Sequence, residues 1–290
     1  MMATNPADLF PTLERRAAAL DADGQPKRIV AIADVHGMAS HLDHLVAGVN
    51  GIDAFADAAF FILGDLVDRG PDSRGAIDRA LALAKGRAGS RIFLGNHDEW
   101  FLRFLIDELA ASELSNWIEQ GGRETLASYQ AGTDRSPQGV REAILKDCPS
   151  HLECLRRADT IALVGDLAFV HAGVDPTKPL DNQSARDCVW IRAPFMRHAG
   201  PLSHIVVHGH TPQKDNRPTL TENRISIDTG ACYGGLLTAA LIDREAKTLD
   251  FLSTDGVNLV IREPVLTDRG FGTVRKAYRP GGALVFRNEA

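Results

Sequence analysis

The sequence is short of cysteine, of aromatic residues and of long hydrophobic runs, and each shortage excludes a class of protein. Its four cysteines form no Cys-x-x-Cys pair, so we expect reduced thiols in a cytoplasmic protein and no disulfide framework. No apolar run is long enough for a membrane span or a signal peptide, which argues against a membrane location. A formal net charge of -6 argues against nucleic acid as a partner.

What the sequence does contain is a repeated pattern of β-branched or aromatic runs that end in Asp, Asn or His beside a glycine. The run 60–63 leads into Gly64-Asp65-Leu66-Val67-Asp68-Arg69-Gly70. Four further runs behave alike: 28–33 before Asp34-Val35-His36-Gly37, 91–94 before Gly95-Asn96-His97-Asp98, 167–170 before His171-Ala172-Gly173, and 205–207 before His208-Gly209-His210. Open α/β sheets bind ligands at the carboxyl ends of their strands, so we expect these side chains to share one site.

Together these motifs resemble those of the calcineurin-like metallophosphoesterases, and more narrowly their phosphoprotein-phosphatase branch. The resemblance extends from about residue 29 to residue 243. It implies an α/β fold in which two β-sheets form a sandwich flanked by helices. It also implies two divalent transition-metal ions, with manganese as the first choice and iron or zinc as alternatives.

The resemblance implies a role for each residue of the site. Asp65 would bridge the two ions, and the other ligands would be Asp34, His36, Asn96, His171 and His210. The catalytic residues would be His97 as general acid, Asp68 as the carboxylate that orients it, and Arg69 and Arg192 as phosphate ligands. Neither a Cys-x5-Arg motif nor a Walker A loop is present, which leaves hydrolysis by direct attack of metal-bound water.

The rest of the chain divides around this pattern. We expect an N-terminal extension over 1–27, with a helix-forming stretch at 13–20, and a metallophosphoesterase domain over 28–253. Residues 99–160 read as a helical insertion, and the strands after 160 as a second, largely antiparallel sheet. Residues 254–290 read as a peripheral C-terminal extension.

Two residues keep two interpretations each, Trp100 has one, and His208 has no assigned role. Trp117, in Trp117-x-x-x-Gly121-Gly122 before Thr125, is either core or part of a motif seen in bacterial and phage members, and helical spacing indicates core for Trp100. Asp228 either accepts a hydrogen bond from a metal-bound histidine or holds a turn. His208, two residues before His210, is predicted to point the same way on an extended segment, without an assigned role.

The predicted substrate is a phosphorylated serine or threonine in a protein or peptide. Leu94 stands where phosphoprotein phosphatases usually have arginine, and Leu-Gly-Asn-His-Asp is similar to the bacterial dinucleoside tetraphosphatases. Asp68-Arg69, in contrast, matches the protein phosphatases. Hydrolysis of a dinucleoside tetraphosphate or another small phosphoester is therefore the second prediction. An inactive, metal-dependent binding module is the alternative of another class.

Overall fold

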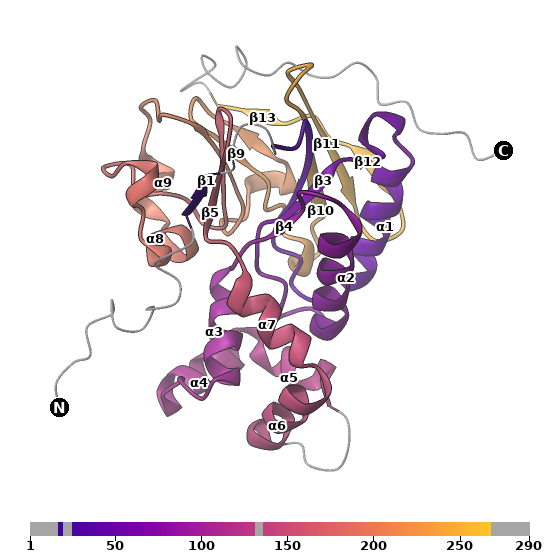
Figure 1. Cartoon of the computed structure of the whole chain (residues 1–290), viewed down its shortest axis with the longest axis vertical. Coiled ribbons are helices and arrows are strands. Elements are labelled where there is room, and N and C mark those ends of the chain that lie inside the picture. The colour runs from indigo at the N-terminus through magenta and orange to yellow at the C-terminus, as the bar shows by residue number, and fades with distance from the viewer. Residues whose placement is uncertain (1–16, 20–24, 131–135, 268–290) are drawn as a thin grey trace.

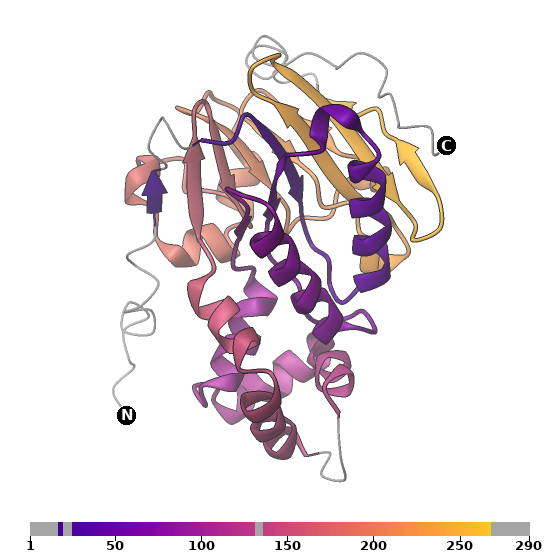
Figure 2. The same cartoon turned by 45° about the vertical axis from the view of Figure 1, so that its right-hand side comes forward.

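The computed structural model describes residues 17–19, 25–130 and 136–267, and it places two β-sheets face to face between layers of helices (Figures 1 and 2). The first sheet has the order β12-β11-β10-β2-β3-β4. Its strands are β2 (Arg28–Ile32), β3 (Ala59–Ile62), β4 (Arg91–Ile92), β10 (Leu237–Asp243), β11 (Thr248–Thr254) and β12 (Leu259–Ile261). The predicted two-sheet α/β fold is confirmed.

The second sheet has the order β1-β5-β6-β7-β9-β8-β13. Its strands are β1 (Ala17–Ala19), β5 (Ile161–Val164), β6 (Leu167–Val170), β7 (Ile205–His208), β8 (Thr219–Leu220), β9 (Arg224–Ser226) and β13 (Val265–Leu266). Only β5/β6 and β8/β9 pair antiparallel among its six pairings.

The prediction of a largely antiparallel second sheet is therefore wrong. Two short helices that the sequence argument missed, α8 (Ala185–Trp190) and α9 (Ala193–Arg197), lie in the crossover between β6 and β7, and this crossover allows the two strands to run parallel. The long antiparallel hairpin β10–β11 belongs instead to the first sheet, where β10 pairs with β2.

Side-chain alternation along the strands separates two cores. On β2, Ile29 and Ala31 face the second sheet and pack with residues such as Phe169 on β6. Val30 and Ile32 point the other way and pack under the helices. Because both faces of these strands are buried, their sequences read as continuous apolar runs, which is typical of parallel strands.

Helices cover both outer faces and extend beyond one end of the sandwich. Helices α1 (Ala39–Asn50) and α2 (Ser73–Gly86) cover the first sheet, and α8 and α9 lie on the other side, against the second sheet (Figure 1). The end group consists of α3 (Asn96–Leu105), α4 (Ala111–Trp117), the π-helical turn η4 (Ile118–Gly122), α5 (Arg123–Ser128), α6 (Pro137–Asp147) and α7 (Pro149–Arg157). The short 3-10 turns are η3 (Asp53–Phe55), η5 (Leu180–Asn182), η6 (Lys214–Asn216) and η7 (Ala231–Tyr233).

The ends of the described chain differ from the sequence-based picture. The alanine run 17–19, predicted to be helical, forms β1 and pairs with β5, so pairing in the sheet overrides helix propensity. The predicted glycine-rich loop at 270–282 lies outside the described residues. Beyond residue 253, β12 and β13 add a strand to each sheet.

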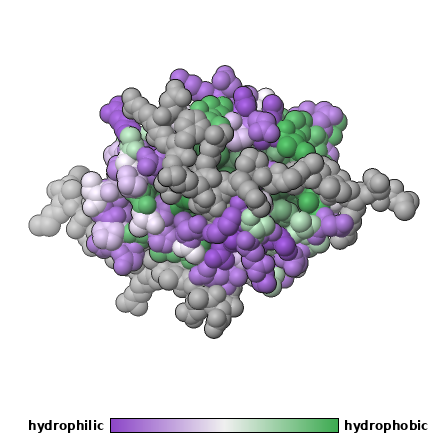
Figure 3. Space-filling view, turned by 90° about the horizontal axis from the view of Figure 1, so that it is seen from above, coloured by the Kyte–Doolittle hydropathy of each residue, from purple (hydrophilic) through white to green (hydrophobic). Residues whose placement is uncertain are grey.

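The surface opposite the end group of helices carries both polar and apolar residues where grey atoms do not cover it (Figure 3). Seen from above, apolar residues form separate patches among polar ones, apart from what grey atoms cover (Figure 3). In the part of the chain that the structure describes, no helix has the length and apolar character needed to cross a membrane.

Candidate metal centre

The turns that follow β2, β3, β6 and β7 are tied to one another by hydrogen bonds. The amide of Asp34 donates to the carbonyl of Gly64 at 3.2 Å, and Nδ1 of His171 donates to the carbonyl of Leu63 at 2.7 Å. The amide of Gly209 donates to the carbonyl of His171 at 2.9 Å. Strand ends from both sheets therefore meet at one place, as the sequence pattern predicts.

Left-handed backbone is concentrated in these turns. Six of the ten described non-glycine residues with positive φ lie here: Asp34, His36, Asp65, Asp68, Arg69 and His210. Each such conformation costs on the order of 1–3 kcal/mol and persists only where surrounding contacts impose it. The approach of the turns is so close that a Cβ atom on Gly95 would collide with Oδ1 of Asp65.

Asp65 occupies the centre of the cluster, between histidines that come from both sheets. Its Oδ2 lies 3.4 Å from Nε2 of His36 and 3.5 Å from Nε2 of His171. Two groups of three buried residues share this carboxylate, and within each group the ligand atoms lie within 4.8 Å of one another. The first group is His36, Asp65 and His97, and the second is Asp65, His171 and His210. A carboxylate in this position can bridge two metal ions.

The histidines present neutral nitrogen lone pairs to this centre. Nδ1 of His36 donates to the carbonyl of Val67 at 2.8 Å, and Nδ1 of His171 is held by Leu63, so Nε2 of each ring is left as an acceptor. Burial lowers the pKa of His36 to about 3 and that of His210 to about 2. Burial lowers the pKa of His171 as well. The three imidazoles are therefore neutral, as histidine ligands of a metal must be.

The carboxylates bring uncompensated negative charge into the same place. Both oxygens of Asp34 accept from the amide of His210, at 3.0 and 2.9 Å. Burial, followed by the proximity of Asp228 and Asp65, raises the pKa of Asp34 well above its ordinary value. Divalent cations would remove this repulsion between Asp34, Asp65 and Asp228.

The donor set fits divalent metal ions. Asn96, the first residue of α3, places Oδ1 3.2 Å from Nε2 of His171, so the amide predicted as a ligand lies at the cluster. Carboxylate, amide and imidazole donors without a thiolate suit manganese, iron or zinc. The structure thus brings together all six predicted ligand residues.

A buried acid–base pair adjoins this ligand cluster. Nδ1 of His97 and Oδ2 of Asp68 are 2.6 Å apart, and both side chains are almost fully buried. The Asp68 carboxylate also accepts from Nε1 of Trp117 at 2.8 Å and from the hydroxyl of Thr125 at 2.6 Å. The ring of Trp117 is therefore part of the core, and its N–H also contacts the pair.

Two arginines reach the cluster from different segments. Arg69 donates through Nη1 to Nε2 of His36 and through Nη2 to Nε2 of His97, the latter at 2.7 Å. Arg192 is exposed and donates through Nε to Nε2 of His210 at 2.9 Å. Both guanidinium groups are thus placed to meet an anion that binds beside the ligand residues.

Asp98 is a site residue to which the sequence argument assigned no role. Its Oδ1 accepts from the amides of Leu66 at 2.9 Å and Val67 at 3.3 Å, and its Oδ2 accepts from Gly95 at 3.1 Å. This fully buried carboxylate holds the turn that carries Asp65, and burial raises its pKa to about 7. Its place directly after Asn96-His97 is the signal that could have identified it.

His208 and Asp228, whose roles the sequence left open, make contacts outside the group of predicted ligands. His208 places Nε2 2.7 Å from the hydroxyl of Ser226 and packs edge-on against Phe195, away from the cluster. The prediction that it points the same way as His210 is wrong, because His210 adopts a left-handed conformation that ends the strand alternation. Asp228 accepts from the amide of Gly230 at 3.0 Å, which supports the turn interpretation.

Aromatic rings flank the cluster. Trp100 is half-buried and packs against the main core, as its helical spacing predicts. Its ring also packs edge-on against His97, with ring centres 5.3 Å apart, and against Trp190 at 5.0 Å. The ring of Tyr233 is 63% exposed and lies 5.3 Å from the guanidinium of Arg69. An anion bound by Arg69 would therefore find exposed aromatic surface beside it.

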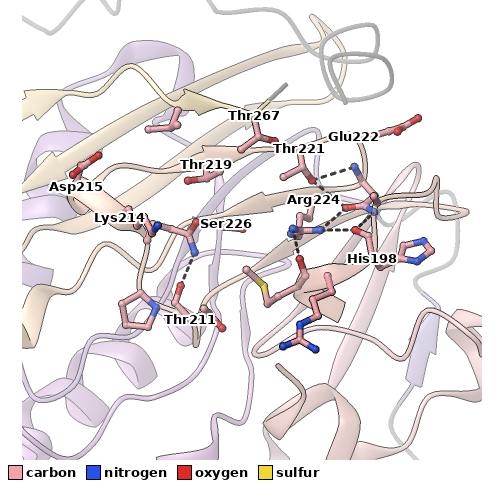
Figure 4. A pocket seen from close by; sticks show the side chains of 17 residues that line it. His198, Thr211, Lys214, Asp215, Thr219, Thr221, Glu222, Arg224, Ser226 and Thr267 are labelled. Carbon is pink, nitrogen blue, oxygen red and sulfur yellow. Dashed lines mark hydrogen bonds between the residues drawn. The ribbon is translucent and has the colours of Figure 1, made fainter. Parts of the chain in front are cut away.

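A cavity of about 660 Å³ opens next to the segment that follows His210 (Figure 4). Thr211 and Lys214 line it from that segment, and Arg197 and His198 line it from the end of α9. Arg224 also lines it, 8% exposed, with its guanidinium bonded to backbone carbonyls and to the side chain of Asn223. Asp215 and Glu222 line the same cavity, so its wall carries charges of both signs.

Comparison with known proteins agrees with this arrangement. The family model for calcineurin-like phosphoesterases matches residues 27–262. The chain belongs to that family. By this membership the chain is a metallophosphoesterase-family hydrolase.

Similarity to individual proteins is more distant. The chain is 26% identical over 209 residues to the asymmetrical bis(5'-nucleosyl)-tetraphosphatase PrpE of Anoxybacillus flavithermus, covering 66% of this chain and 78% of that protein. A putative diadenosine tetraphosphatase of known structure has a TM-score of 0.53 at 19% identity, with 86% of this chain and 98% of the other covered. A serine/threonine phosphatase from Saccharomyces cerevisiae has a TM-score of 0.50 at 14% identity, with 91% and 88% covered. At these identities the two structures show a shared fold.

Proposed function

We propose that this phosphoesterase hydrolyses phosphate monoesters of alcohols, in particular phosphoserine and phosphothreonine in proteins. The observation that carries the proposal is the buried His97–Asp68 pair, 2.6 Å apart, directly beside the two groups of metal-ligand atoms. An alkoxide is a poor leaving group and needs a proton as the ester bond breaks, and this pair is built to deliver one.

The six ligand residues would hold two divalent ions, which supply an activated water and charge compensation for phosphate. Arg69 and Arg192 bind the phosphate oxygens and orient the ester, so that its leaving oxygen faces Nε2 of His97. His97 then donates its proton to that oxygen, while Asp68 holds Nδ1 and stabilises the charged ring. The complete set of ligands and acid argues against an inactive binding module.

A second candidate is hydrolysis of a dinucleoside tetraphosphate. The relative from Anoxybacillus flavithermus bears that name, and this chain has features that suit such a substrate. The exposed ring of Tyr233 can stack with a base, and Arg197 and Lys214, which line the cavity beside Thr211, can meet further phosphates. The leaving group would then be a phosphate, which needs general acid catalysis much less than an alkoxide does.

Two measurements test these proposals. Release of nitrophenol from an aryl phosphate in the presence of manganese separates an enzyme from an inactive binding module, and no release with manganese, iron or zinc would contradict the proposed function. The values of kcat/KM for a phosphothreonine peptide and for diadenosine tetraphosphate, with the same metal, then decide between substrates. A preference of about a hundredfold for the dinucleotide, about 2.7 kcal/mol in transition-state binding, would overturn the first choice.

A further inference from the structure

The carboxylate of Asp68 is held by a distant part of the chain, the segment 111–128 that comprises α4, η4 and α5. Oδ2 accepts from Nε1 of Trp117 in addition to bonding His97, and Oδ1 accepts from the hydroxyl of Thr125. Asp68 is 0% exposed, so solvent does not compete for these bonds. The direction in which the carboxylate faces His97 is therefore determined by two side chains of the segment.

The backbone of the Asp68 turn is bonded to the same segment. The amide of Asp68 donates to the hydroxyl oxygen of Thr125 at 2.8 Å, and the amide of Arg69 donates to the carbonyl of Gly121 at 3.1 Å. Asp68 and Arg69 have φ values of 73° and 70°, a strained conformation that such contacts must maintain. The segment 111–128 thus supports both Asp68, which binds the proposed acid His97, and Arg69, the proposed phosphate ligand.

The π-helical turn η4 explains why this contact can form. Gly121 adopts φ 118°, and a Cβ atom there would lie 2.6 Å from the amide nitrogen of Arg69. A Cβ atom on Gly122 would lie 2.5 Å from the ring of Trp117. The spacing Trp-x3-Gly-Gly-x2-Thr therefore places an indole N–H, a carbonyl and a hydroxyl against one short turn.

We propose that Trp117 and Thr125 are positioning residues for proton transfer by His97, an inference that rests on the proposed function. Their two donors hold the Asp68 carboxylate on Nδ1 of His97. Nε2, which meets Nη2 of Arg69 at 2.7 Å, then lies beside the proposed phosphate ligand and can face the leaving oxygen when an ester binds there. Packing alone would explain the indole ring, which contacts Phe101 and Phe104, but it does not require the N–H to end on Asp68.

The test separates the donor groups from the packing. Trp117→Phe keeps a ring and removes the N–H, and Thr125→Val keeps the shape and removes the hydroxyl. Tyr129→Phe is the matched control, because it removes a buried hydroxyl bonded to His151 at 2.6 Å, close to the same segment and without contact to Asp68. We expect each test variant to lose about tenfold in kcat for an alkyl phosphate and less than about threefold for an aryl phosphate with a good leaving group.

The control should change kcat for both substrates by the same small factor, and all three variants should keep the metal content of the parent protein. In a His97→Asn background, Trp117→Phe should cause no further loss for the alkyl phosphate, because the acid that it positions is gone. Equal losses for both substrates, or a loss that persists without His97, would reduce Trp117 to a packing residue and overturn the proposal.

A spectroscopic measurement keeps this inference separate from the proposed function. In the zinc-loaded protein, whose diamagnetic ions do not broaden proton resonances, the Nδ1 proton of His97, bonded to a buried carboxylate, should give a downfield resonance that is absent in His97→Asn. We expect that resonance to shift or disappear in Trp117→Phe and Thr125→Val, and to remain in Tyr129→Phe. If the parent protein hydrolyses no phosphoester, the proposed function fails. The resonance alone then decides the positioning role, and an unchanged resonance in both test variants would contradict it.

Discussion

At the scale of single residues, Asp65 connects more of the site than any other side chain described above. Its Oδ2 lies between His36 and His171, and its Oδ1 accepts from the amide of His97 at 2.9 Å. One carboxylate thus joins the first sheet, the second sheet and α3. Removing its charge should therefore weaken metal binding more than it lowers the stability of the fold.

For Asp65→Asn we expect loss of at least one of two metal ions per chain and loss of activity, because a neutral amide cannot bridge two dications. Elemental analysis of the purified variant checks this. Two ions retained per chain would show that Asp65 is not the bridging ligand.

For His97→Asn we expect an unchanged metal content and a loss of about 10²–10⁴ in kcat for alkyl phosphates, the usual range for general acid–base catalysis. The loss should shrink for aryl phosphates, whose leaving groups need no proton. Steady-state kinetics with a series of leaving groups measures this, and equal losses throughout would remove His97 from the acid role.

At the scale of elements, the site depends on helices that contribute no predicted metal ligand. The π-helical turn η4 and helix α5 contact the Asp68 turn, and α7 packs against α2 and α3 behind them. Stability in these elements is thus coupled to the geometry of the site.

Gly121→Ala should lower the free energy of unfolding by about 1–3 kcal/mol, because its φ of 118° is unfavourable for alanine and the added Cβ would meet the Arg69 amide. We also expect KM to rise, since Arg69 is the proposed phosphate ligand. Gly86→Ala is the control, because no atom lies within 4 Å of its added Cβ at the end of α2. Denaturant unfolding and kinetics on both variants check this, and equal stability of the two would contradict the role of η4.

His151 on α7 should make stability depend on pH. Burial lowers its pKa below the ordinary value of 6.5, despite the raising effect of Asp78, 2.9 Å from the ring. Below about pH 6.5 the unfolded chain therefore binds more protons than the folded one, and stability falls as the pH falls towards the folded pKa. We expect His151→Gln to lose less stability between pH 7 and pH 5 than the parent protein does, measured by denaturant unfolding. Identical pH slopes would contradict this.

At the scale of the whole molecule, the two sheets meet at a buried cluster whose carboxylates repel one another. Metal ions should bind the folded chain and not the unfolded one, because the ligands come from strand ends of both sheets. Each site should add about 2.7 kcal/mol of stability when the free metal is at 100 times its Kd.

We therefore expect a chelator to lower Tm by several degrees and manganese to restore it. The shift should be smaller in Asp65→Asn, which serves as the matched comparison. Thermal unfolding followed by circular dichroism measures both, and a Tm that does not respond to chelator in the parent protein would argue against resident metal ions.

The sequence by itself determined the family, the strands that end in polar residues, and the residues that meet at the site. It could do so because strand ends with Asp, Asn, His and glycine form a local pattern, and parallel strands bring such ends to one edge. Only the tertiary structure decided which other residues and strands contact these site residues and strands. The partners of Asp68 come from residues about 50 positions away, His208 turns away because of the backbone at His210, and β10 joins the first sheet through pairing with β2. These outcomes depend on long-range contacts and on strained φ values, neither of which leaves a periodic signal in the chain.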